Sequence, residues 1–139
     1  MNTIAPNHYK TESGLQVWDV TRYMSGNMAQ AFQYVYRAGR KGDEAEDLRK
    51  AVAFLEDWYS HQDVPAMGNL SPGDMLEKEG PLRTLLFAAE PWKRMILNQI
   101  WHMDFMGDAV DGLEARVHGY HGAMLHLQHR IAELGGVDG

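Results

Sequence analysis

Apolar side chains recur at alternating spacings of four and three residues over the last third of the chain. The positions are Trp92, Ile96, Gln99, Met103, Met106, Val110, Leu113, Val117, Tyr120, Met124, Leu127, Ile131 and Leu134, with Gln99 as the one polar member. This heptad pattern runs for about six repeats and is typical of helices that pack along a shared seam. The C-terminal part of the chain is therefore predicted to be helical.

Two arrangements of this seam are open. In the first, a single helix of about 43 residues, roughly 65 Å long, pairs with another copy of the chain and makes a coiled-coil homo-oligomer. In the second, the helix breaks at Gly107–Asp108, Asp108 caps a new helix, and the two halves form an antiparallel hairpin. Four glycines favour the break because each weakens a helix by up to about 1 kcal/mol, although all four lie off the seam. They are Gly107, Gly112, Gly119 and Gly122.

The N-terminal part, residues 1–62, predicts a small unit of about three helices. They cover about Leu15 to Met24, Gly26 to Ala38 and Asp43 to His61. Gly39 is suited to the left-handed position that ends a helix. Asp43 and Glu46 have the spacing of a capping box at the start of the third helix. The expected fold is all-α.

Residues 63–81 are expected to be a loop or linker between this unit and the C-terminal region, residues 82–139. The stretch contains three prolines and three glycines and shows no sustained periodicity. Proline and glycine together interrupt helices and strands. A chain of 139 residues is long enough to bury a core.

Charge and composition exclude several classes of function. The net charge is −6, which argues against binding to long nucleic acid, because such proteins concentrate positive charge. The absence of cysteine excludes disulfides and thiolate metal sites. No segment has the apolar length of a signal or membrane helix. We expect a cytoplasmic protein that does not enter a membrane.

Four histidines lie close together in the C-terminal region, and their spacing alone would permit a metal site. They are His118, His121, His126 and His129. In the heptad frame three of them fall on outer positions and His121 flanks the seam. We therefore expect a solvated face.

Cations cluster after the second predicted helix, in "YVYRAGRKG". Arg37, Arg40 and Lys41 could hold phosphate oxygens, and Asp19 or Asp47 could hold Mg²⁺. Gln30, Gln33 and Arg37 share one helical stripe that could line a cleft. The other interpretation is a well-capped junction, because cations also stabilise a helix C-terminus. No phosphate loop, dinucleotide-binding fingerprint or hydrolase elbow is present.

A family resemblance covers about Pro6 to His61. "PNHY", "QVWDVT", "QYVYRAGRKG" and "EDLRKAVAFLED" resemble, in order and spacing, the small phage early-protein domain that is found in the nucleotide kinase of T-odd coliphages. The resemblance implies phosphoryl transfer from ATP, with Mg²⁺, to a deoxynucleoside monophosphate without a phosphate loop. It also implies oligomers and, for a phage protein, the host cytoplasm.

The same resemblance implies the site residues. The positions that match the family are His8, Tyr9, Asp19, Arg37, Gly39, Arg40, Lys41, Asp47 and Lys50. Arg37, Lys41 and Asp47 are the expected catalytic residues, and Asp19 and Asp47 the expected metal ligands. Substrate is expected to be bound by His8, Tyr9, Gln30, Gln33, Arg37, Arg40 and Lys50.

The chain departs from the family at three positions in the expected cleft. Gln16, Gln30 and Gln33 stand where the family shows Glu, Asn and Lys. Phosphoryl transfer depends on cations and carboxylates placed against developing charge, so these changes favour binding over turnover. The alternative is a non-catalytic, oligomeric module that captures a nucleotide, a signalling nucleotide or a host protein, and a coiled-coil adaptor is a third hypothesis.

Overall fold

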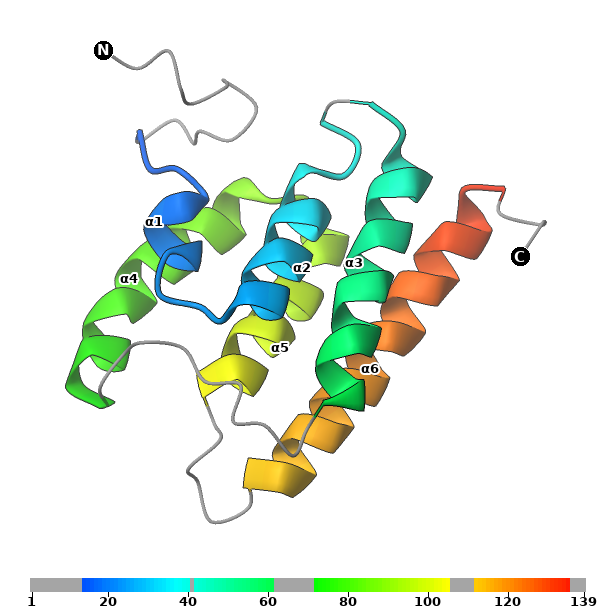
Figure 1. Ribbon diagram of the computed structural model, residues 1–139. Coiled ribbons are helices and arrows are strands. Elements are labelled where there is room, and N and C mark those ends of the chain that lie inside the picture. Colours follow the sequence, from blue (N-terminus) through cyan, green and yellow to red (C-terminus); the bar gives the residue numbers. More distant parts are fainter. Residues whose placement is uncertain (1–13, 41, 62–71, 106–111, 136–139) are drawn as a thin grey trace.

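The computed structural model describes residues 14–40, 42–61, 72–105 and 112–135 (Figure 1). Within these ranges the chain forms six helices, and the predicted all-α class is confirmed. The helices are α1 (Trp18–Thr21), α2 (Gly26–Arg37), α3 (Glu44–Ser60), α4 (Pro72–Ala88), α5 (Pro91–Phe105) and α6 (Gly112–Glu133).

The helices α2 and α3 lie where the sequence predicts them. The Asp43 carboxylate caps α3 by accepting a hydrogen bond from the Glu46 amide at 3.2 Å. Gly39 follows α2 with a φ of +82°, the left-handed conformation that ends a helix. The first helix is shorter than predicted, because the chain turns at Met24, whose amide bonds to the Thr21 carbonyl at 2.9 Å.

The stretch predicted as a linker is helical from Pro72 onward, as part of α4. Proline is compatible with the first position of a helix, because its missing N–H would have no intrahelical partner there. Pro81 lies inside α4. Leu82 and Leu85, which follow it, are buried in the core. Packing of this apolar face therefore overrides the local signals of proline and glycine.

The C-terminal seam is divided between α5 and α6, which pack against each other, so the structure has the hairpin and not the single long helix. A Cβ atom on Gly119 would lie 2.7 Å from Met103 Cγ, and one on Gly122 would lie 2.9 Å from Gln99 Nε2. Because Gly119 faces Met103 and the later Gly122 faces the earlier Gln99, α5 and α6 are antiparallel. The two glycines face α5 and permit its close approach, although the heptad frame placed them off the seam. Gly107 and Asp108, the predicted break, lie outside the described residues.

All described helices contribute to one core, so the two predicted units are not separate in space. Helix α2 contacts both α3 and α5, and α3 contacts α6 (Figure 1). The largest fully buried side chains come from both halves of the chain and include Phe32, Tyr36, Leu55, Trp101 and Leu127. The seam thus finds its partner helices within its own chain. None of the described helices combines the length and the apolar character that a bilayer crossing requires.

Candidate functional site

Several of the predicted site residues gather on the surface that α2 and α3 form together. Arg37, in the last turn of α2, has its Nε 3.4 Å from Asp47 Oδ2 in the first turn of α3. The Arg37 guanidinium lies 5.6 Å from the centre of the Tyr34 ring, and the Lys50 ammonium lies 5.5 Å from the same centre. The structure therefore brings two cations to a single tyrosine, with Arg37 paired to Asp47 and the Lys50 ammonium 3.9 Å from Glu46 Oε2.

These side chains differ in their access to solvent. The Asp47 carboxylate is buried, whereas 28 % of the Arg37 side chain and 49 % of the Lys50 side chain are exposed. Asp47 therefore serves as the internal counter-charge of Arg37. The outer parts of both cations remain accessible to an anion, and we call Tyr34, Arg37, Asp47 and Lys50 the cationic end of the site.

Arg40 is directed to the junction of α4 and α5. Its Nη2 donates to the carbonyl of Ala88 at 2.8 Å and lies 3.4 Å from Glu90 Oε1. Its guanidinium stacks over the Tyr36 ring at 4.4 Å. Arg40 thus ties the turn after α2 to the junction of α4 and α5, in agreement with the capped-junction interpretation for this residue.

The two carboxylates predicted as magnesium ligands have separate partners. Asp19 accepts a hydrogen bond from the Gln16 amide at 2.8 Å and pairs with Arg22 at 3.2 Å, so it stabilises α1. Asp47 pairs with Arg37. In the described ranges, no three His, Asp or Glu side chains gather closely enough to hold a metal ion. The four clustered histidines of α6 are exposed, as expected.

Three predicted site residues, His8, Tyr9 and Lys41, lie outside the described residues. Of the glutamines, Gln30 is exposed and Gln33 is half-buried on α2. Gln30 also lines a cavity at the opposite end of the same surface.

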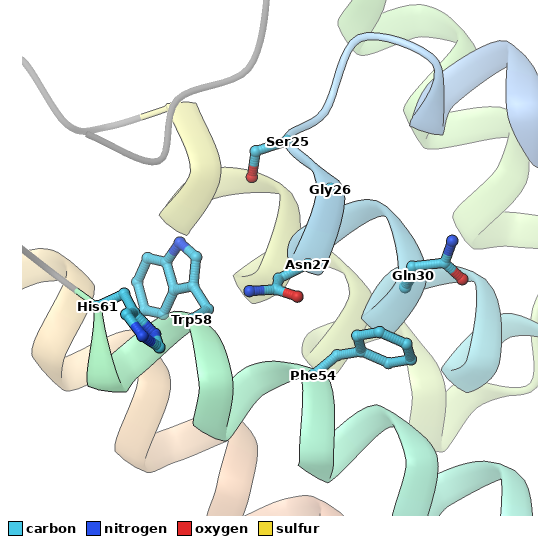
Figure 2. Close-up of a pocket in the computed structure, with 7 residues that line it drawn as sticks. All are labelled: Ser25, Gly26, Asn27, Gln30, Phe54, Trp58 and His61. Atoms are coloured by element: carbon cyan, nitrogen blue, oxygen red, sulfur yellow. The ribbon is translucent and has the colours of Figure 1, made fainter. Parts of the chain in front are cut away.

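This cavity has a volume of about 460 Å³ and lies between the start of α2 and the end of α3. Its lining residues are Ser25, Gly26, Asn27, Gln30, Phe54, Trp58 and His61. Figure 2 shows Asn27 between the Trp58 ring and Gln30, with Phe54 on the α3 side. Two aromatic rings and two primary amides thus share one cavity. Phe54 also stacks on Tyr34, with ring centres 5.8 Å apart, so the cavity and the cationic end are joined by this pair of rings.

Beside this cavity lie buried hydrogen-bond donors that find no acceptor in the described part of the chain. Trp58 is 2 % exposed, and its Nε1 has no partner among the described residues. The nitrogen lies at the edge of the indole nearest Ser25 (Figure 2). Arg116 packs over the same ring at 5.3 Å, and its Nε and Nη2 also have no acceptor within the described part of the chain. Buried donors usually have partners. Trp58 Nε1 and these two Arg116 nitrogens are covered by protein atoms, so they lie behind the wall of the cavity and not on its surface.

Acidic groups surround the same end. Asp104 accepts hydrogen bonds from the Ser25 amide at 2.7 Å and the Ser25 hydroxyl at 2.6 Å. Burial raises the pKa of Asp104 to about 6, against the opposing effects of Ser25 and Arg116. Asp57 accepts a hydrogen bond from the Asn27 amide at 2.7 Å. The cavity end is therefore less favourable to an anion than the cationic end.

The sequence interpretation missed most of the cavity. Trp58 reads as a core aromatic, and its burial agrees with that, but nothing in the local pattern shows that its N–H lacks an acceptor. Phe54 and Asn27 carry no motif.

Comparison with known proteins supports a relationship for the first part of the chain. A family described as a protein of unknown function, DUF3310, matches residues 4–56, which end within α3. No curated protein and no solved structure matches the chain. The α2–α3 surface, with both ends of the candidate site, is built mostly from the segment that is similar to the DUF3310 family.

Proposed function

We propose that this protein binds a nucleoside phosphate along the α2–α3 surface, with the phosphates at the cationic end and the base in the cavity. One observation carries the proposal. The Tyr34–Phe54 stack joins two partly exposed cations, Arg37 and Lys50, to a cavity with aromatic and amide walls.

Charge decides the orientation of the ligand. Phosphate oxygens accept hydrogen bonds from guanidinium and ammonium groups, which Arg37 and Lys50 supply. At the other end Asp57 and Asp104 oppose an anion. A base, in contrast, fits aromatic walls and can use the Gln30 and Asn27 amides, as small-molecule sites commonly combine apolar walls with a few polar groups.

The spacing along α2 agrees with a single ligand. Gln30 and Arg37 are seven residues apart, which corresponds to about 10 Å along a helix. A nucleoside phosphate can reach from a base at Gln30 to a phosphate at Arg37. The stripe of Gln30, Gln33 and Arg37 would then follow the sugar.

Phosphoryl transfer is a further step of the proposal, taken from the resemblance to the nucleotide kinase of T-odd coliphages. It needs Mg²⁺ with ATP and a carboxylate to orient the metal or the attacking group. Asp47 is the candidate for this carboxylate, but it already forms an ion pair with Arg37. Asp19 has its own partners in α1. These contacts favour the alternative of a module that captures a nucleotide without transferring phosphate.

Self-association is a separate proposal. Five residues of the seam that predicted it are buried in the core of the same chain, namely Ile96, Met103, Tyr120, Met124 and Leu127. An oligomer would therefore use other surfaces, such as the exposed Phe87, Met95 and Leu125. Light scattering at two protein concentrations tests it, and a constant mass equal to that of one chain would contradict it.

Calorimetric titration with a panel of ribo- and deoxynucleoside mono-, di- and triphosphates, with and without Mg²⁺, tests binding. The same samples are assayed for a diphosphate product. Binding with no product above the level of an Asp47→Asn variant supports capture, whereas Mg²⁺-dependent product that this variant loses supports the kinase. The absence of binding to every member of the panel would contradict the proposed function.

A further inference from the structure

A buried lysine from the C-terminal half holds the end of α2. Lys93, in the first turn of α5, is 0 % exposed. Its ammonium donates hydrogen bonds to the carbonyl of Tyr36 at 2.7 Å and to the carbonyl of Ala38 at 2.6 Å. These two residues flank Arg37 in the chain.

The backbone around Arg37 is therefore held at three successive carbonyls. The carbonyl of Arg37 itself accepts a hydrogen bond from the Arg40 amide at 2.8 Å. The last carbonyls of a helix have no intrahelical partner and form its negative end. An ammonium that binds two of them satisfies both the hydrogen bonds and the dipole, and it fixes the direction in which the Arg37 side chain leaves the helix.

The charged surroundings of Lys93 connect the same turn to α4 and α5. Glu90 lies 3.1 Å from the Lys93 ammonium and 3.4 Å from the Arg40 guanidinium. Glu44, on α3, also acts on Lys93. Burial lowers the pKa of Lys93 to about 8, against the opposing effect of Glu90, so the ammonium is charged at neutral pH.

A gain in stability alone is a weak explanation for the buried ammonium of Lys93. Well-packed apolar replacements of a buried ion pair are often neutral or stabilising, because the charges must be removed from water. A donor placed on the two carbonyls next to Arg37 has a specific geometric effect that an apolar side chain would lack.

We infer that Lys93 is a positioning residue for the phosphate site: it acts through the backbone of residues 36–38 to aim Arg37 at the phosphate of the ligand. The inference rests on the proposed function. Lys93 lies outside residues 4–56, the segment similar to the DUF3310 family, and it would thus support a site that this segment forms.

The test separates the phosphate-dependent part of the affinity from the rest. The Kd of a nucleoside triphosphate and the Kd of the matching nucleoside are measured for the wild type and for Lys93→Met. The ratio of nucleoside Kd to nucleotide Kd is expected to fall about tenfold in the variant, within the range found for coupled neighbours. The nucleoside Kd is expected to change little.

Two further variants distinguish positioning from general destabilisation. Ile100→Ala removes buried volume about 10 Å further along α5, without a polar contact to the turn, and should lower the melting temperature while leaving the ratio unchanged. In an Arg37→Ala background, Lys93→Met should have no further effect on the ratio. An unchanged ratio in Lys93→Met, or an equal fall in the Arg37→Ala background, would overturn the inference.

Lys93→Gln removes the ammonium and is one bond shorter, so it loses at least one of the two carbonyl contacts, and it serves if Lys93→Met does not fold. Its ratio should lie between those of the wild type and Arg37→Ala, and a ratio equal to that of the wild type would again overturn the inference. If the wild type binds nucleotide and nucleoside equally, the phosphate contact in the proposed function fails. If the wild type prefers the nucleotide but the Lys93 variants keep the wild-type ratio, only the role of Lys93 fails.

Discussion

The Nε of Arg37 lies 3.4 Å from the buried Oδ2 of Asp47, and this pair joins the last turn of α2 to the first turn of α3. Asp47 lowers the positive charge that Arg37 offers to a ligand. Replacing it by asparagine should therefore strengthen nucleotide binding several-fold. It should also destabilise the fold by about 1–3 kcal/mol, because Arg37 loses the carboxylate with which it forms an ion pair. Calorimetry and urea unfolding measure the two effects. Weaker nucleotide binding by Asp47→Asn would instead mean that the carboxylate contacts the ligand through a metal.

Gln30 tests the base end of the site. Its side chain is exposed, so Gln30→Ala should change stability by no more than about 0.5 kcal/mol. It should weaken the binding of the nucleoside and of the nucleotide by the same factor of about five, because the lost hydrogen bond is to the base. Gln128→Ala, on an exposed position of α6, is the matched control. A loss confined to the phosphorylated ligand would place the base elsewhere.

Asp104 should give the stability a pH dependence. Its pKa is raised to about 6 in the folded chain, from an ordinary value near 3.8, so the folded state binds the proton more tightly. Its contribution to stability is then fully present below pH 4 and is lost as the pH rises through about 6. Urea unfolding from pH 4 to 7 should show this loss in the wild type and not in Asp104→Asn. Equal slopes for both proteins would contradict the assignment.

Gly39 and Gly42 form a matched pair for the turn between α2 and α3. Both have φ near +80°, which costs an alanine about 1–2 kcal/mol. A Cβ on Gly39 would also lie 2.9 Å from Glu44 Oε1, whereas nothing lies within 4 Å at Gly42. Glu44 is held by Arg130 at 2.9 Å. Gly39→Ala should therefore lower the unfolding free energy more than Gly42→Ala, and an equal loss would show that Glu44 moves freely.

The sequence predicts the local elements well and the tertiary partners poorly. The cap at Asp43 and the glycine after α2 act within a few residues, so their patterns are visible in the chain. The seam indicates the buried positions Ile96, Met103, Tyr120, Met124 and Leu127 correctly, but Leu134 is exposed. A heptad pattern is the same for a partner in another chain and for a partner in the same chain. Gly119 and Gly122 face α5, which only the three-dimensional packing reveals.

The same limit applies to the site. Arg37, Asp47 and Lys50 are close in sequence, and the structure pairs Arg37 with Asp47 and places both cations beside the Tyr34 ring. Arg40 belongs to the same motif but bonds to Ala88, because α4 and α5 approach the turn from the distant half of the chain. The contact of Lys93 with the carbonyls beside Arg37 has the same origin.

The central claim is that Arg37 meets a phosphate, and charge reversal tests it most directly. The Kd of one nucleoside triphosphate and of its nucleoside are measured by calorimetry for the wild type, Arg37→Glu and the control Arg83→Glu. Arg83 is exposed on α4, away from the α2–α3 surface, and also pairs with a carboxylate. We predict that Arg37→Glu raises the Kd of the triphosphate at least about tenfold and leaves the Kd of the nucleoside unchanged, while Arg83→Glu changes neither Kd. Unchanged affinity of Arg37→Glu for the triphosphate would contradict the account.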